Sequence, residues 1–197
     1  MKSTFERFAG YCGVLAGIAG FLYSVAFIIL RSDLLSALFL LLGGLFGTAA
    51  LTALYERLRG TDSAFAFWGL LFALAGAIGS TIHGGFDLSN ALHPPATATD
   101  LPNPVDPRGL LTFGFAGIGL FVFSWLILQS ASFSKNFGYL GYLSAILMII
   151  LYLGRLIILQ ATSLAIVIPA LLEGFIVNPL WYIWLGITFL HSKNPSQ

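Results

Sequence analysis

Long apolar runs, separated by short charged or proline-rich segments, constrain this chain more than any other feature of its sequence. The first run, Phe8–Leu30, has about 23 residues, which at about 1.5 Å per residue can cross a hydrocarbon layer of about 30 Å. It is too long for the core of a signal peptide, and no small-residue cleavage site follows it. Hydrophobic residues make up 58% of the chain and charged residues 9%, whereas an average soluble domain is about 25% charged. Too little polar surface exists to cover a soluble core, so the sequence predicts an all-α, polytopic membrane protein.

We expect a single domain over residues 1–197, built as a bundle of six transmembrane helices. Asp62 or Ser63 can cap the third helix, because either side chain offers an oxygen to its free N–H groups. Pro169 suits the first turn of a helix, which would start the sixth helix near Ile168, and Pro179 is then expected to kink that helix. The predicted spans are Phe8–Leu30, Leu34–Leu54, a third from Ser63 to His83 or beyond, Gly109–Ser130, Phe137–Leu159, and a sixth within Ile166–Leu190.

The segment between the third and fourth predicted helices, Ser80–Arg108, holds five of the eight prolines. It is therefore expected to be a semi-rigid, proline-rich loop. Basic residues collect on the cytoplasmic side of membrane proteins. With the N-terminus inside, that side receives six basic residues and the other side receives two, Arg31 and Arg108. We therefore expect a multi-pass protein of the cell (cytoplasmic) membrane with both termini cytoplasmic and an extracytoplasmic proline-rich loop. The six residues are Lys2, Arg7, Arg57, Arg59, Lys135 and Lys193.

Two pairs of glycines at four-residue spacing, Gly13 with Gly17 and Gly43 with Gly47, predict close helix–helix contacts. Such contacts could form within the chain or with partner proteins. The lipid bilayer is the other expected partner. A net charge of +1, without a clustered basic face, argues against nucleic acid.

Three polar residues follow the apolar part of the third helix at helical spacing: His83, Asp87 and Asn90. If the helix continues through the glycines after His83, these residues share one face, and Gly76 and Ser80 extend that stripe into the membrane. One interpretation is a polar pocket for a proton, a metal or a ligand headgroup. The other is a helix end that reaches water, where polar residues need no special explanation.

Arg155 and Glu173 are charged residues inside the predicted fifth and sixth helices. Charges at membrane depth are costly, so they pair with each other or line a wet cavity. The two helices form a hairpin that would bring both residues to a similar depth. The pair could therefore be a buried ion pair, or Arg155 could bind an anionic group and Glu173 relay protons.

Catalytic motifs are scarce in this sequence. His83, Asp87 and His93 could supply three ligands to a zinc ion, but no HExxH motif or Cys-His cluster accompanies them. We therefore predict no metal site. No G-x-S-x-G, P-loop or Rossmann glycine pattern occurs either, so the sequence identifies no catalytic residue and no cofactor.

The opening ERFAGYCGVLAGIAG and the later stretch FGYLGYLSAILMIILYLGRL resemble small multi-pass membrane proteins of prokaryotes to which no function is assigned. The resemblance covers the hydrophobic layout and two helix starts rich in glycine and aromatic residues. It implies a prokaryotic membrane bundle and no particular activity.

The sequence leaves three functional classes open. The leading hypothesis is an integral membrane protein that binds or translocates a small molecule or lipid through an extracytoplasmic polar pocket, with His83, Asp87, Asn90, Arg155 and Glu173 as its ligand-binding residues. The second is an intramembrane enzyme, such as a metal-dependent hydrolase, that uses His83 and Asp87. The third is a structural subunit that binds partner proteins.

Overall fold

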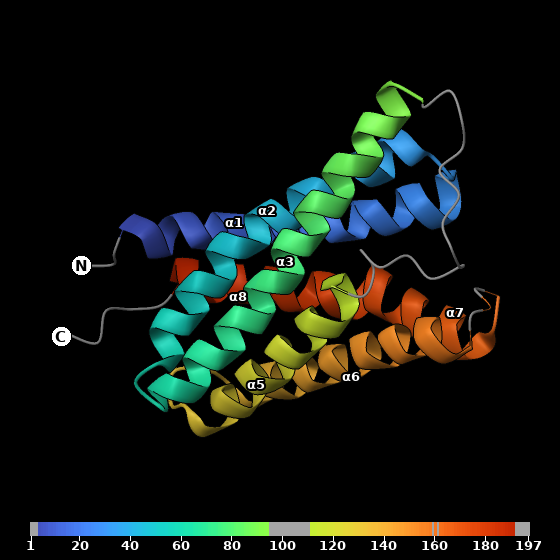
Figure 1. Ribbon diagram of the computed structural model, residues 1–197. Helices are drawn as coiled ribbons and strands as arrows, with labels where there is room; N and C mark the ends of the chain where they lie inside the picture. Colours follow the sequence, from blue (N-terminus) through green and yellow to red (C-terminus); the bar gives the residue numbers. More distant parts are fainter. Residues whose placement is uncertain (1–3, 95–110, 159, 161, 192–197) are drawn as a thin grey trace.

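The computed structural model describes residues 4–94, 111–158, 160 and 162–191, apart from the side chains of residues 111, 112 and 155. Within this part of the chain, every regular element is a helix (Figure 1). Five helical segments are long and apolar enough to cross a membrane, and Phe113–Gln129 is a shorter apolar helix. The all-α class expected from the sequence is confirmed. The five long segments are Thr4–Leu30, Asp33–Leu58, Ser63–Leu92, Lys135–Gly154 and Leu164–His191.

Two of these long segments, and the shorter apolar helix, combine α-helix with a wider π-helical turn. The described elements are α1 (Thr4–Ser24), η1 (Val25–Leu30), α2 (Asp33–Leu58), α3 (Ser63–Leu92), η2 (Leu111–Phe115), α5 (Ala116–Gln129), α6 (Lys135–Ile157), α7 (Leu164–Leu172), η3 (Glu173–Val177) and α8 (Asn178–His191). The proline-rich loop lies mostly outside the described residues, which resume at residue 111.

Side-chain caps mark several helix starts. Ser32, Asp62 and Ser134 each accept a hydrogen bond from the backbone N–H three residues later, which satisfies a donor that the first turn of a helix leaves free. Asp62 is thus the cap of α3, one of the two alternatives that the sequence allowed. Helix α3 continues through Gly84 and Gly85 to Leu92, as the predicted polar stripe requires.

The start of the last span differs from the prediction. Helix α7 begins at Leu164 after Ser163, so Pro169 lies inside the helix rather than in its first turn. Proline cannot donate a hydrogen bond from its nitrogen, but the apolar run before it is long enough to form a turn on its N-terminal side. Pro179 is separated from the π-helical turn η3 by Asn178, whose N–H donates to the carbonyl of Glu173. This wider turn changes the backbone hydrogen bonding immediately before Pro179, whose nitrogen cannot donate a hydrogen bond.

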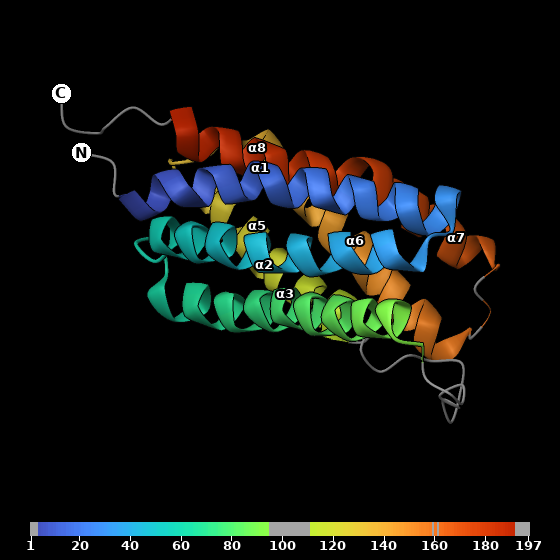
Figure 2. The same cartoon turned by 90° about the horizontal axis from the view of Figure 1, so that it is seen from above.

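The helices form a closed ring in which each packs against the next along the chain, and α8 returns to pack against α1 (Figures 1 and 2). Glycines make the closest approaches. A Cβ atom on Gly13 would lie 2.9 Å from the Cα atom of Gly186 in α8, and one on Gly17 would lie 2.7 Å from the carbonyl oxygen of Pro179. The first predicted glycine pair is therefore occupied within the chain. In the second pair, Gly47 faces the Tyr182 ring, whereas a Cβ on Gly43 would meet only ordinary contacts.

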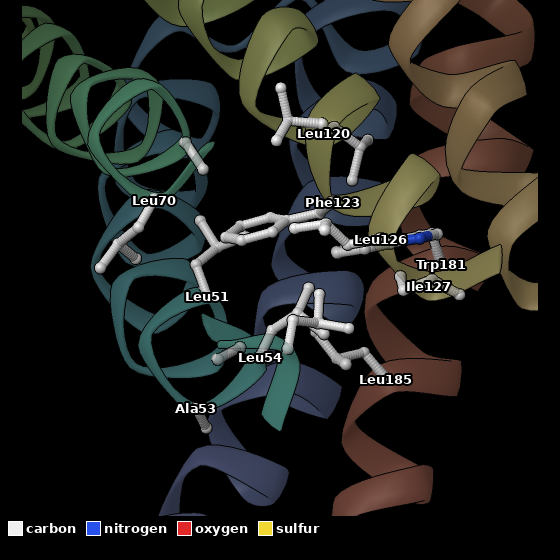
Figure 3. Packing of buried hydrophobic residues seen from close by; sticks show 14 of the residues in the cluster. Leu51, Ala53, Leu54, Leu70, Leu120, Phe123, Leu126, Ile127, Trp181 and Leu185 are labelled. Atoms are coloured by element: carbon white, nitrogen blue, oxygen red, sulfur yellow. The ribbon is translucent and has the colours of Figure 1, made fainter. Parts of the chain in front are cut away.

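A hydrophobic core fills the end of the ring where α1 begins and α8 ends. Leu54, Phe123, Leu126, Trp181 and Leu185 are fully buried there and come from three different helices (Figure 3). Phe137 stacks on Trp181 with ring centroids 5.2 Å apart. Close packing at this end leaves the opposite end of the interior for the site described next.

Candidate functional site

A cavity of about 880 Å³ occupies the bundle interior at the end opposite to the core. Its walls come from the second half of α1, η1, much of α2, the second half of α3, η2, α5, α6, α7, η3 and the start of α8. Most of the lining is apolar. The polar groups belong to a limited set of residues, which includes four of the five site residues predicted from the sequence: His83, Asp87, Asn90 and Glu173.

The predicted stripe on α3 forms one wall of the cavity. Gly76, Ser80, His83, Asp87 and Asn90 all line it, because residues at these spacings recur on one helical face. The His83 and Asp87 side chains are 14% and 37% exposed, and both residues line the cavity.

His83 and Asp87 interact directly. The Nε2 atom of His83 lies 3.0 Å from Oδ2 of Asp87, one helical turn further along α3. A carboxylate in this position orients the imidazole ring. Ligand binding and acid–base chemistry both use such an arrangement.

Glu173 contributes a carboxyl group from another wall, formed by η3. The residue is 4% exposed. Its Oε1 atom accepts a hydrogen bond from the Ser144 hydroxyl on α6, whereas Oε2 has no hydrogen-bond partner among the side chains that the structure describes. The Asn178 side chain lies beside the same carboxyl group but does not reach hydrogen-bond geometry with Oε2. The cavity wall therefore contains a buried carboxyl group, one oxygen of which has no hydrogen-bond partner in the described part of the chain.

The local backbone explains how Glu173 comes to lie in the cavity wall. The residue begins the π-helical turn η3, and π-helical turns inside α-helices frequently occur at functional sites. Gly174 follows it, and a side chain there would collide with the Ser24 hydroxyl. Glycine at this position thus lets η3 approach the end of α1 closely, and Ser24, Gly174 and Asn178 all line the cavity beside Glu173.

The predicted contact between Arg155 and Glu173 involves a side chain outside the described residues. The described partner of Glu173 is Ser144, which precedes Arg155 by about three turns of α6. Sequence reasoning did not identify Ser144, Asn178 or Tyr182 as neighbours of the site. The signal for Asn178 was available, since it is an amide within an apolar span.

The three groups considered for zinc do not gather in one place. His93 is the exposed C-terminal cap of α3, beyond the stripe that lines the cavity. Among the residues that the structure describes, no group of three His, Cys, Asp or Glu side chains is positioned to hold a metal ion.

Comparison with protein-family models, with curated proteins and with solved structures finds no match for this chain. The cavity and its polar groups are therefore the main guide to what this protein does.

Proposed function

We propose that this membrane protein binds a small amphipathic molecule or a lipid in the cavity. Binding would either hold the ligand within the membrane or be one step in carrying it across. The observation that carries the proposal is the cavity itself, whose volume of about 880 Å³ falls within the range of about 300–1,000 Å³ typical of ligand sites. Apolar walls suit a hydrocarbon or ring system. The polar groups on α3 and η3 suit a headgroup, because they give the site two places where hydrogen bonds can form.

We further propose six membrane crossings, with η2 and α5 together making the fourth. Leu111–Gln129 would extend about 28 Å as a helix, close to the hydrocarbon thickness of about 30 Å. Helix α5 also packs between α3 and α6 in the ring, where a crossing is required to connect them in sequence. An even number of crossings agrees with α1 beginning and α8 ending at the same end of the bundle (Figure 1). The excess of basic residues at that end supports cytoplasmic termini and a cavity in the extracytoplasmic half.

Labelling of single cysteines tests this orientation. On a Cys12→Ala background, His93→Cys should react with a membrane-impermeant maleimide in intact cells, because His93 lies exposed at the cavity end of α3. Gly60→Cys should react only after permeabilisation, because Gly60 lies in the exposed turn between α2 and α3 at the other end. The opposite labelling pattern would invert the proposed orientation.

Filling the cavity tests the binding function. Gly43 lines the cavity, and a Cβ atom there would meet nothing closer than the Ala19 Cβ at 3.6 Å. A leucine at this position should therefore be tolerated while occupying ligand space. We expect Gly43→Leu to reduce photolabelling of cavity-wall peptides by a diazirine-bearing fatty alcohol about tenfold, equivalent to about 1.4 kcal/mol of binding free energy.

Gly85→Leu is the matched control for this experiment. Gly85 is also a helical glycine with ordinary contacts, 3.6 Å from Leu41 Cδ1, but it does not line the cavity. Its labelling pattern, read by peptide mass spectrometry, should match that of the unmodified protein. Equal labelling of the cavity wall in both variants would contradict ligand binding in the cavity.

A further inference from the structure

We infer that the cavity selects amphipathic organic cations, with the Glu173 carboxyl group as the acceptor for the positively charged group. This inference rests on the proposed binding function and specifies its ligand class. It starts from the buried Oε2 atom of Glu173, which has no hydrogen-bond partner among the described residues, and from the cavity that Glu173 lines.

The other charged groups of the cavity wall favour a positive ligand. The described lining residues include three carboxylic acids, Asp33, Asp87 and Glu173, together with His83, and none of them is Lys or Arg. Helix dipoles and hydroxyl groups do not supply a full compensating charge to a buried carboxylate. A proton or a cation is needed, and a bound organic cation would supply the missing charge from inside the cavity.

The apolar part of the lining suits the body of such a ligand. Tyr23 and Phe27 on the first span stack with ring centroids 5.6 Å apart, and both line the cavity. Tyr182 lines it on the side of Glu173. Aromatic faces attract cations more strongly where water is excluded. A ligand that combines a positive charge with hydrocarbon would therefore use both kinds of surface at once.

Two probes of nearly equal shape and opposite charge test the inference without any mutation. Tetraphenylphosphonium and tetraphenylborate are titrated into the purified full-length protein in uncharged detergent, and binding is followed by calorimetry. We expect tetraphenylphosphonium to bind at least about tenfold more tightly, a difference of about 1.4 kcal/mol. Equal affinities, or tighter binding of the anion, would overturn the inference.

Substitutions then assign the preference to Glu173. Glu173→Gln should remove most of the preference for tetraphenylphosphonium, and Glu173→Asp, which keeps the charge, should retain part of it. Glu56→Gln is the matched control, because it makes the same chemical change at a different place. Glu56 forms an exposed pair with Arg59 at the end of α2 that lies away from the cavity. Unchanged cation preference in a folded Glu173→Gln variant would contradict the role of this residue.

An organic ammonium group can belong to a free amphipathic amine or to a lipid headgroup. Competition against tetraphenylphosphonium separates these sources: dodecyltrimethylammonium represents the free amine and phosphatidylethanolamine the lipid, with phosphatidylglycerol as the anionic reference. Displacement by either ammonium-bearing competitor but not by phosphatidylglycerol supports the inference and identifies the source. Displacement by phosphatidylglycerol alone would contradict it.

The fatty alcohol used to test the binding function is neutral, so its labelling does not depend on a preference for cations. Absence of the cation preference together with retained alcohol labelling would therefore reject this inference and leave the proposed binding function standing.

Discussion

Gly84→Ala is expected to be less stable than Gly85→Ala by about 2–3 kcal/mol, although the two glycines are neighbours on α3. A Cβ atom at Gly84 would lie 2.7 Å from the Ala37 carbonyl oxygen and 2.9 Å from the Leu41 Cα atom of α2. These are backbone atoms, which cannot move aside without shifting the whole of α2 away from α3. Overpacking of this kind typically costs about 1–3 kcal/mol, against a gain of up to about 1 kcal/mol from replacing glycine in a helix.

At Gly85 only the gain applies, because a Cβ atom there would meet Leu41 Cδ1 at an ordinary 3.6 Å. The free energy of unfolding of both variants can be measured by titration with sodium dodecyl sulfate in mixed micelles. Equal stabilities would mean that α2 and α3 do not approach as closely at Gly84 as the structure has them. A shift of α2 would also disturb the cavity, because Ala37 and Leu40 of α2 line it.

Arg57→Met is expected to lower the free energy of unfolding by about 2–3 kcal/mol. Arg57, near the end of α2, pairs with Glu6 of α1, and the two side chains are only 18% and 22% exposed. Its guanidinium group also lies over the rings of Phe133 and Phe189, at 5.7 Å and 4.9 Å from their centroids. One cation therefore joins α1, α2, α8 and the connection before α6. Its removal withdraws the ion partner of a partly buried carboxylate, which costs more than loss of an exposed pair.

Arg59→Met is the control for this prediction. Arg59 pairs with Glu56 at 3.0 Å, but both side chains are at least half exposed, so its loss should cost less than about 1 kcal/mol. The double variant Glu6→Gln with Arg57→Met should recover part of the stability lost in Arg57→Met, since the carboxylate no longer requires a partner. Similar losses at Arg57 and Arg59 would show that the burial of the Arg57 pair contributes little.

Much of the helical layout follows directly from the sequence. Apolar stretches of this length must satisfy their backbone hydrogen bonds internally in a lipid environment, so they form helices. The ends of α2, α3 and α6 agree with the predicted spans to within a few residues, apart from the longer course of α3. The start of α7 was misplaced because Pro169 is compatible with more than one helical position. The fourth predicted span could be compared only in part, since its first residues lie outside the described ones.

The helical periodicity of the sequence was sufficient to predict one wall of the candidate site. The spacing of Gly76, Ser80, His83, Asp87 and Asn90 put these residues on one face of one helix, and that face lines the cavity. Helical periodicity is a property of a single segment, so the amino-acid sequence alone could determine this wall and identify Glu173 as a charge at membrane depth.

The tertiary structure decided what surrounds these residues. Ser144 and Glu173 are separated by 29 positions in the chain yet form a hydrogen bond, and nothing in the periodicity of either helix specifies which turn of α6 faces η3. The division of the interior into a packed core at one end and a cavity at the other likewise depends on how closely the helices approach one another. Those distances depend on complementary side-chain volumes across helix pairs, so they are a property of the assembled bundle.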